Sequence, residues 1–232
     1  VDTDEYRFLP FRSPAGKEIY EYGEKQKRLR EDHNMGDVMS MLLQPNKKGD
    51  KLSDLEFKNF FALMIAAGND TTRYSMASSI HAIANNPYIF NCLKSAPDDA
   101  PVWDSATEEF LRWASPTMHF RRTATEDYKL HGKQIREGDK VTIWFTSGNY
   151  DERKFSNPFN LILERENNNH IAFGQGGPHV CLGMWLARLE VRVAMQELLK
   201  RVSKIEQIAP EKYLRSNFIR GIKNLPVKLT SA

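Results

Sequence analysis

The order of apolar and polar positions along the chain predicts a mainly helical protein with small β-sheets. Residues 17–30 are charged with few apolar positions, which is typical of a solvated helix, and residues 36–44 indicate a second, short helix. After a polar loop, Ser53 and Glu56 form a capping box, and no proline follows until Pro87. We therefore expect one long helix from Ser53 onward.

The middle of this long helix, residues 60–67, is apolar on every side. A helix on the protein surface needs a polar face, so the pattern predicts that this helix runs through the centre of the protein. The polar stretch "NDTT" follows directly, at residues 69–72, and is conspicuous in such a place.

The rest of the chain predicts one more helix, several short strands and a final helix. A helix covers about residues 105–113, and residues 128–146 alternate apolar and polar positions between turn residues, which predicts strands. The final helix reaches about Arg201 and carries one apolar stripe, formed by Leu182, Leu186, Leu189 and Val193. Residues 218–230 indicate strand again, and no repeat or convincing boundary interrupts the chain. We expect one domain over residues 1–232.

Composition limits the possible functions. The net charge of +3 comes from 33 basic and 30 acidic residues spread along the chain, so nucleic acid is not an expected partner. No segment indicates a signal peptide or a bilayer span. The two cysteines, Cys92 and Cys181, suit no disulfide framework, which favours a reduced, cytoplasmic setting. The chain begins at Val1 without a methionine, and we treat it as a fragment.

The stretch "HIAFGQGGPHVCLGMWLAR", residues 170–188, sets Cys181 behind a run of glycines and ahead of a predicted helix. Glycines allow a flat group to approach the backbone closely, and Pro178 stiffens the turn. A helix that begins near Cys181 would favour its thiolate, which makes this cysteine a candidate metal ligand or nucleophile. The alternative is a buried core cysteine, the common state of a free cysteine.

Two kinds of cysteine site lack their partners in this sequence. A cysteine protease needs a partnered histidine and a third orienting group, and nothing places them. Structural zinc needs four ligands, and the pair His179 and Cys181 has no second pair at usable spacing. A single axial thiolate remains, which suffices for haem iron because the porphyrin supplies the in-plane donors.

The segment "FGQGGPHVCLG" resembles the haem-binding loop of the cytochrome P450 monooxygenases. The resemblance implies that Phe173 packs beside the sulfur, that His179 meets a haem propionate and that Cys181 binds the iron. Gly176 and Gly183 would also border the haem. The loop is one residue longer than the common family pattern, with the extra residue among the glycines.

Further motifs that resemble the family follow in the expected order. "AAGNDTT" is similar to the family's central-helix motif, with Gly68, Asp70 and Thr71 at the oxygen-activating positions. "EEFLRW" supplies the family's Glu-x-x-Arg as Glu109 and Arg112. Each motif alone has an ordinary explanation: an (i, i+3) pair on a solvated helix, a structural carboxylate, or a threonine bonded to the preceding turn.

The resemblance assigns roles to more residues. Arg165 matches the third member of the Glu-x-x-Arg cluster, and Arg122 falls where the family binds a propionate. Residues 117–120 would line the substrate pocket, with ordinary loop packing as the alternative. Arg188 and Arg192 could meet an acidic ferredoxin, although exposed arginines usually serve solubility alone.

The implied function is a haem-thiolate monooxygenase containing haem b, iron protoporphyrin IX. It would insert one atom of O2 into a C–H bond of a hydrophobic substrate: a sterol side chain, a terpenoid, a fatty acid or an alkane. A ferredoxin or flavoprotein reductase would supply electrons to a monomer in the cytoplasm. Two rivals remain: a peroxide-driven haem-thiolate peroxygenase or dehydratase, and a haem-binding or inactive fragment, since the resemblance covers only the C-terminal half of a family member.

Overall fold

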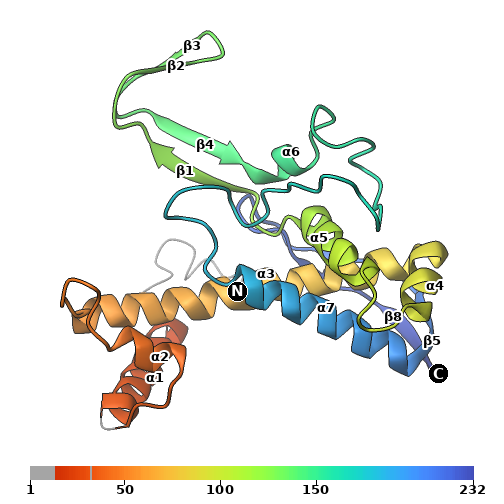
Figure 1. The fold of residues 1–232 in the computed structure, drawn as a ribbon, viewed down its shortest axis with the longest axis horizontal. Coiled ribbons are helices and arrows are strands. Elements are labelled where there is room, and N and C mark those ends of the chain that lie inside the picture. Colours follow the sequence, from red (N-terminus) through yellow and green to blue (C-terminus); the bar gives the residue numbers. More distant parts are fainter. Residues whose placement is uncertain (1–13, 32) are drawn as a thin grey trace. The chain divides into compact units, whose positions relative to one another are not determined.

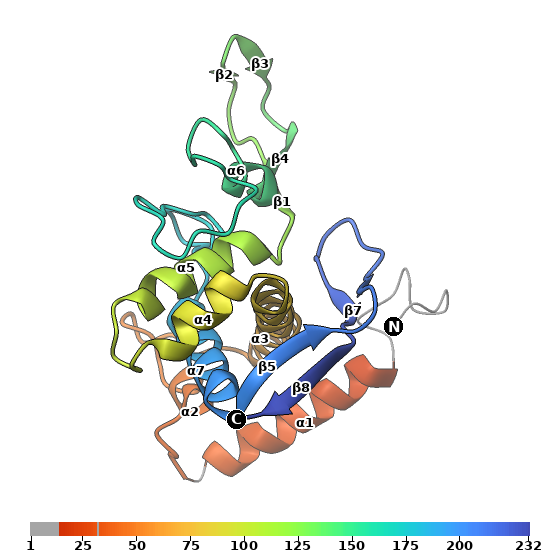
Figure 2. The same cartoon turned by 90° about the vertical axis from the view of Figure 1, so that its right-hand side faces the viewer.

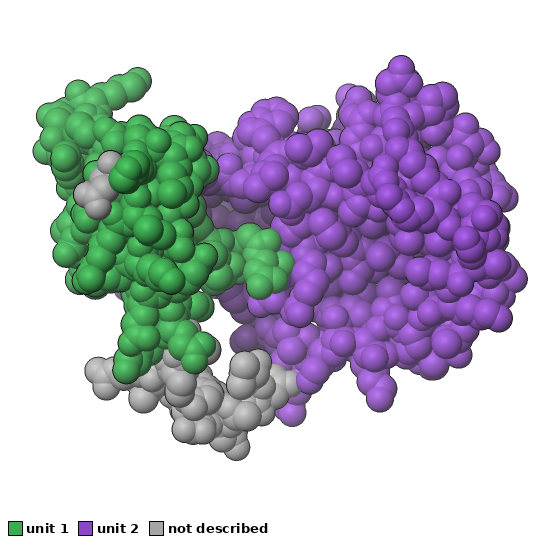
Figure 3. Space-filling model, turned by 90° about the horizontal axis from the view of Figure 1, so that it is seen from below, with its two compact units in different colours: residues 1–69 green, residues 70–232 purple. Residues whose placement is uncertain are grey.

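The computed structural model describes residues 14–31 and 33–232. The opening stretch, residues 1–13, lies outside the described residues. The chain divides into two compact units, residues 1–69 and residues 70–232, drawn in different colours in Figure 3. The boundary falls inside one continuous helix, α3 (Asp54–Ala84). The single domain expected from the sequence stays a prediction.

The first unit contains α1 (Pro14–Glu31), α2 (Val38–Leu42) and the beginning of α3. Its core is small and consists of Met39, Phe57 and Phe61, with partly buried neighbours such as Ile19. The helix pattern predicted all three elements.

The capping box at the start of α3 is confirmed. The Ser53 N–H donates to Oε2 of Glu56 at 2.8 Å, and the Glu56 N–H donates to Oγ of Ser53 at 3.4 Å. These two bonds satisfy N–H groups that have no partner within the helix, and so fix where α3 begins.

In the second unit, α4 (Pro87–Ser95) and α5 (Val102–Ala114) both pack on α7 (Met184–Arg201), as Figure 2 shows. The core between these helices holds Ile89, Leu93, Trp103, Phe110, Leu111, Val191, Met195 and Leu199. Lys94 reaches across from α4 and donates to the carbonyl oxygens of Leu199 and Val202, at 2.9 and 2.8 Å. The end of α7 therefore has a cationic partner for its free carbonyl groups.

The strands of the second unit form antiparallel pairs: β1 (His119–Thr123) with β4 (Lys140–Trp144), β2 (Tyr128–Leu130) with β3 (Lys133–Ile135), β5 (Val202–Gln207) with β8 (Val227–Ser231), and β6 (Lys212–Tyr213) with β7 (Ile222–Asn224). Figure 1 shows the β2–β3 hairpin extending from the end of the β1–β4 pair. The alternating pattern predicted strand through Phe145 and Thr146, but the chain turns into α6 (Phe145–Asn149), where Phe145 is buried.

The apolar stripe predicted on the final helix is present but faces solvent. Leu182, Leu186, Leu189 and Val193 are 76%, 59%, 57% and 43% exposed. Of the buried residues of α7, Val191, Met195 and Leu199 lie on the other side of the helix, and Gln196 is buried as well. Two faces of α7 are apolar. The stripe identified from the sequence is the face that stays exposed in the second unit.

The apolar middle of α3 also differs from the expectation. Leu63 and Ile65 are 62% and 43% exposed, and residues 66–70 are exposed as well. The all-round apolar pattern correctly indicates a helix, but a pattern cannot show which residues cover it. Within the described residues, the beginning and the second half of α3 contain buried positions, while the middle of the helix stays exposed.

None of the helices in the described ranges combines the length and the hydrophobicity needed to cross a bilayer.

Candidate functional site

Cys181 ends the segment that we call the glycine loop, residues 173–181, and it is a free, exposed cysteine. The alternative of a buried core cysteine is therefore wrong for Cys181. Its backbone N–H donates a hydrogen bond of 3.0 Å to the carbonyl oxygen of Phe173, which joins the two ends of the loop. Cys92, in contrast, packs against the core of the second unit.

The glycines of the loop adopt conformations that other residues avoid. Gly174, Gly176 and Gly177 have φ angles of 73°, 67° and 74°. A Cβ atom built at Gly176 or Gly177 would meet no atom within 4 Å, and the same holds at Gly183 just before α7. Open backbone next to an exposed thiol is what a flat cofactor requires for close approach, so these residues fit a porphyrin bound through Cys181.

Next to Phe173, the first residue of the glycine loop, three side chains from separate segments contact one another. Glu108 of α5 accepts hydrogen bonds from Arg188 of α7 at 2.6 and 2.9 Å, and its Oε2 lies 3.1 Å from Nε2 of His170. Burial pushes the pKa of Glu108 upward, but hydrogen bonds from His170 and Arg188 outweigh it and lower the pKa to about 2. We call Glu108, His170 and Arg188 the loop clamp. The sequence analysis named Arg188, as a docking residue, but it named neither Glu108 nor His170.

The predicted cluster of Glu109, Arg112 and Arg165 is confirmed. The Glu109 and Arg112 side chains are 0% exposed, and Arg165 donates from Nε to Glu109 at 3.0 Å. The backbone N–H of Ile162 and the amide of Asn168 donate to the same carboxylate, at 2.9 and 3.2 Å. Arg112 also donates to the carbonyl oxygens of Asn149, Pro158 and Asn160. A buried charge network with this many partners fixes the segment that leads into the glycine loop.

A second residue missed from the sequence, Asn149 at the end of α6, is completely buried. Its Oδ1 accepts the N–H of Ile171 at 2.7 Å, and its amide donates to Oγ of Ser115 at 2.7 Å. Asn149 therefore ties the approach to the glycine loop to the end of α5. No local pattern marks it, because both partners are distant in sequence.

The polar motif of α3 is exposed at Asn69 and Asp70 and half-buried at Thr71 and Thr72. Asp70 lies in an ion pair with Arg73, with 2.7 Å between Oδ1 and Nη2, and the Thr71 carbonyl oxygen accepts the hydroxyl of Ser75 at 2.9 Å. A Cβ atom at Gly68 would meet nothing within 4 Å. Gly68 belongs to the first unit, whereas Asp70 and Thr71 belong to the second, which also contains the glycine loop.

The remaining predicted site residues lie on the surface of the second unit. Arg122 is exposed on β1 and donates to the carbonyl oxygen of Arg121 at 3.0 Å, and His179 is exposed within the glycine loop. Arg188 and Arg192, expected as a docking surface for a ferredoxin, are both in ion pairs, with Glu108 and Asp104. Their charges are already matched within this chain.

Aromatic residues gather where the sequence predicts a substrate pocket. His119 lies between Trp144 and Phe218, with ring centres 4.5 and 5.9 Å away, and Phe120 stands edge-on to Phe145 and Phe218. The Nδ1 atom of His119 is buried and has no hydrogen-bond partner among the described residues. The cluster joins β1 and β4 to the segment before β7.

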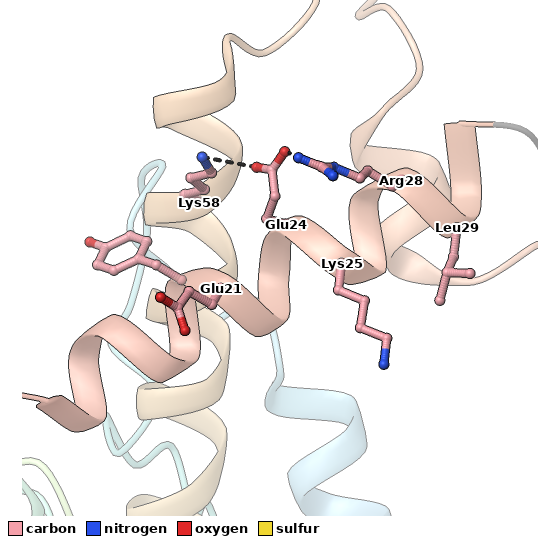
Figure 4. Close-up of a pocket in the computed structure, with 7 residues that line it drawn as sticks. Glu21, Glu24, Lys25, Arg28, Leu29 and Lys58 are labelled. Carbon is pink, nitrogen blue, oxygen red and sulfur yellow. Dashed lines mark hydrogen bonds and ion pairs between the residues drawn. The ribbon is translucent and has the colours of Figure 1, made fainter.

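A surface groove of the first unit lies along α1 and α3, where Lys58 and Arg28 both pair with Glu24 (Figure 4). A groove of the second unit runs between the start of α4 and β5. Neither groove includes Cys181 or Asp70, so neither adds to the candidate site.

Comparison with known proteins agrees with this geometry. The family model described as Cytochrome P450 matches residues 17–228. The methyl-branched lipid omega-hydroxylase of Mycobacterium tuberculosis is 41% identical over 203 residues, which cover 86% of this chain and 47% of that protein. The steroid C26-monooxygenase of the same organism is 33% identical over 216 residues, 93% of this chain and 49% of that protein.

A solved structure shows the same fold. A cytochrome P450 from Mycobacterium marinum, in complex with pseudoionone, superposes with a TM-score of 0.86 at 36% identity, covering 96% of this chain and 54% of that one. The fold and the cysteine loop together define a chain of the haem-thiolate class. This chain belongs to the cytochrome P450 family, and it spans about half the length of the curated relatives it matches.

Proposed function

We propose that this chain carries the cysteine-ligand part of a haem-thiolate monooxygenase, which inserts one atom of O2 into a C–H bond of a hydrophobic substrate. The observation that supports it most directly is the free, exposed Cys181 beside glycines with open Cβ positions, in a chain of the cytochrome P450 family.

The proposed cofactor is haem b, held through the sulfur of Cys181. When bound through a cysteine thiolate, haem would supply the redox chemistry that cleaves the O–O bond. Phe173, Gly176 and Gly183 border the cofactor in this proposal, and the open Cβ positions of the two glycines leave room for a flat ring. Family membership supports a haem-thiolate cofactor, and the choice of haem b is part of the proposal.

Arg122 and His179 are proposed to bind the two carboxylates of the cofactor. Both side chains are exposed and cationic or able to donate, so each can make a charge-assisted hydrogen bond with a propionate. These contacts would orient the ring and neutralise its negative charges.

The α3 residues are proposed to manage oxygen and protons. Gly68 would leave space for O2, and the hydroxyl of Thr71 would donate a hydrogen bond to it. Asp70 is proposed to pass protons inward from solvent, which its exposed position supports. Arg73 donates to Oδ1 of Asp70 at 2.7 Å in an exposed ion pair, which leaves the carboxylate accessible to solvent.

The proposed substrate is a branched apolar chain, such as a sterol side chain or a terpenoid, with fatty acids and alkanes as the wider class. The relatives that act on methyl-branched lipids and steroids support this class, and exposed Phe120 and Phe218 offer apolar lining. A ferredoxin or flavoprotein reductase in the cytoplasm is the proposed electron donor, and the protein is proposed to act as a monomer. Peroxide-driven turnover and haem binding without turnover are the outcomes that would replace this proposal.

The two cysteines provide a matched test. After haem is added, the carbon-monoxide adduct of the reduced wild-type protein should show the red-shifted absorption band of thiolate ligation. Cys181→Ser should abolish this band, while Cys92→Ser, at the other free cysteine, should retain it. A band that survives in Cys181→Ser would exclude this residue as the ligand, and a haem-loaded wild type without the band would contradict the proposed function. Product formed with peroxide but not with reductant and O2 would favour the peroxide-driven rival.

A further inference from the structure

The loop clamp joins three segments that are far apart in the sequence. Glu108 stands 62 positions before His170 and 80 positions before Arg188. The Arg188 guanidinium uses Nε and Nη2 on the two carboxylate oxygens of Glu108, a bidentate pair that fixes both direction and distance. α5, α7 and the approach to the glycine loop are thereby held at one carboxylate.

The clamp is partly shielded from water, most completely at His170. The side chains of Arg188 and Glu108 are 26% and 29% exposed, and that of His170 only 3%. Nδ1 of His170 accepts the N–H of Ala172 at 3.2 Å, so the proton of a neutral ring sits on Nε2 and is donated to Glu108. His170 therefore orders the backbone of residues 170–172 as well as the carboxylate.

Arg188 extends the clamp to the first residue of the glycine loop. Its guanidinium carbon lies 4.8 Å from the ring centre of Phe173 and 5.0 Å from that of Trp185, within range for cation–π contact with both. The ring of His170 lies 5.9 Å from the Phe173 ring. Phe173 is therefore held by two members of the clamp.

Phe173 is in turn bonded to the cysteine. Its carbonyl oxygen accepts the Cys181 N–H at 3.0 Å. Between these two residues the loop is mostly exposed and rich in glycine, which gives the backbone little stiffness of its own. The position of Cys181 thus depends on Phe173, and that of Phe173 depends on the clamp.

We infer that Glu108, His170 and Arg188 are positioning residues for the cysteine ligand: they fix Phe173, and through its hydrogen bond they fix the backbone of Cys181. This inference rests on the proposed function only in that Cys181 is the iron ligand. The clamp itself is a property of the protein without cofactor.

Arg192 offers a matched control on the same pair of helices. It leaves α7 one turn after Arg188, pairs with Asp104 of α5 and donates to the Asp98 carbonyl oxygen at 2.8 Å. Removing Arg192 therefore deletes an equal charge and another contact with α5, without touching Phe173.

The first experiment needs no cofactor. We measure amide hydrogen exchange of Cys181 in the haem-free chain, with buried amides of α5 as internal reference. Glu108→Gln, Arg188→Gln and the milder His170→Gln should each accelerate exchange at Cys181, by about tenfold or more where a charged hydrogen bond is lost. Arg192→Gln should leave it unchanged. Unchanged exchange in all three clamp variants, with intact α5 protection, would overturn the inference.

A lysine substitution separates positioning from simple charge. Arg188→Lys keeps the positive charge, but an ammonium group cannot form the bidentate pair and also lie flat on the Phe173 ring. We expect Arg188→Lys to exchange as fast as Arg188→Gln. Full protection in Arg188→Lys would show that charge alone suffices, which contradicts a positioning role.

The second experiment uses the haem-loaded chain. The clamp variants should lose a part of the red-shifted carbon-monoxide band to the unshifted form, while Arg192→Gln retains the wild-type spectrum. The two proposals fail differently: without a red-shifted band in the wild type the proposed ligand is wrong, whereas equal bands in wild type and clamp variants reject the inference alone.

Discussion

The carboxylate of Glu109 and the guanidinium of Arg112 face each other with no solvent exposure at all, through hydrogen bonds of 2.8 and 2.9 Å. The same carboxylate also receives Arg165, and Arg112 reaches three carbonyl oxygens beyond α5. The pair is therefore the joint at which α5 and the extended segment before the glycine loop are held together.

Removing either half of this joint should be severely destabilising. In Arg112→Met the Glu109 carboxylate keeps a buried charge with less compensation, and we expect a loss of about 3 to 5 kcal/mol in the free energy of unfolding. Urea unfolding measures it. Arg153→Met, which removes an exposed arginine paired with Asp151, should change stability little. Equal losses in the two variants would contradict the structural role of the Glu109–Arg112 pair.

The loop clamp should stabilise the fold in a pH-dependent way. The pKa of Glu108 falls from its usual 4.5 to about 2 in the folded chain. A depressed pKa contributes stability that is complete above about pH 4.5 and is lost as pH falls toward 2. The stability difference between wild type and Glu108→Gln should therefore be constant near neutrality and shrink below pH 4.5. Unfolding curves of both proteins between pH 2 and 7 test this, and a difference independent of pH would contradict it.

Local patterns predicted most of the helices and the strands from β2 to β4, but they missed α4, β1, β5 and β6. The capping box set the start of α3, turn residues separated the short strands, and the glycines of the loop do take positive φ angles. These features depend on neighbours within a few positions, which a sequence displays directly. The match with the Glu-x-x-Arg motif also predicted the cluster of Glu109, Arg112 and Arg165.

Burial and long-range contacts were harder to predict. α7 has apolar residues on two faces, and periodicity cannot tell that Met195 is buried while Leu189 is exposed. The loop clamp depends on contacts over 62 and 80 positions, so no local spacing marks Glu108 or His170. Asn149 was missed for the same reason. The roles of Cys181 and of the α3 motif depend on a cofactor and remain predictions.

Glycines in the two long helices should respond oppositely to alanine. At Gly23 a Cβ atom would lie 2.7 Å from the buried ring of Phe61, so Gly23→Ala should cost about 1 to 3 kcal/mol through overpacking. At Gly68 nothing lies within 4 Å, and Gly68→Ala should stabilise α3 by about 0.5 to 1 kcal/mol. Thermal unfolding of both variants distinguishes them, and shifts of the same sign would contradict the packing described here.

The two threonines of α3 provide a comparison for oxygen chemistry. If Thr71 donates a hydrogen bond to O2, Thr71→Ala should continue to consume electrons but release more hydrogen peroxide and less product. Thr72→Ala, one position further, removes the same group from a different side of the helix and should remain coupled. The measured quantity is the amount of product formed per pair of electrons taken from the reductant. Equal coupling in Thr71→Ala and wild type would remove Thr71 from its proposed role.

Gly176 has both a positive φ angle and an open Cβ position, and substitutions can test the two properties separately. Its φ of 67° makes Gly176→Ala cost about 1 to 2 kcal/mol, whereas Gly176→Asn should cost less because asparagine tolerates this conformation. The Cβ position is open in the protein itself, so only a bound cofactor would meet either side chain. We therefore expect Gly176→Asn to recover stability but not haem affinity, measured by titration with haem. Gln175→Ala, at the neighbouring exposed position without a positive φ, should retain both. If Gly176→Asn bound haem as tightly as wild type, glycine would be needed at this position only for its positive φ angle. The cofactor would then not approach the backbone at Gly176.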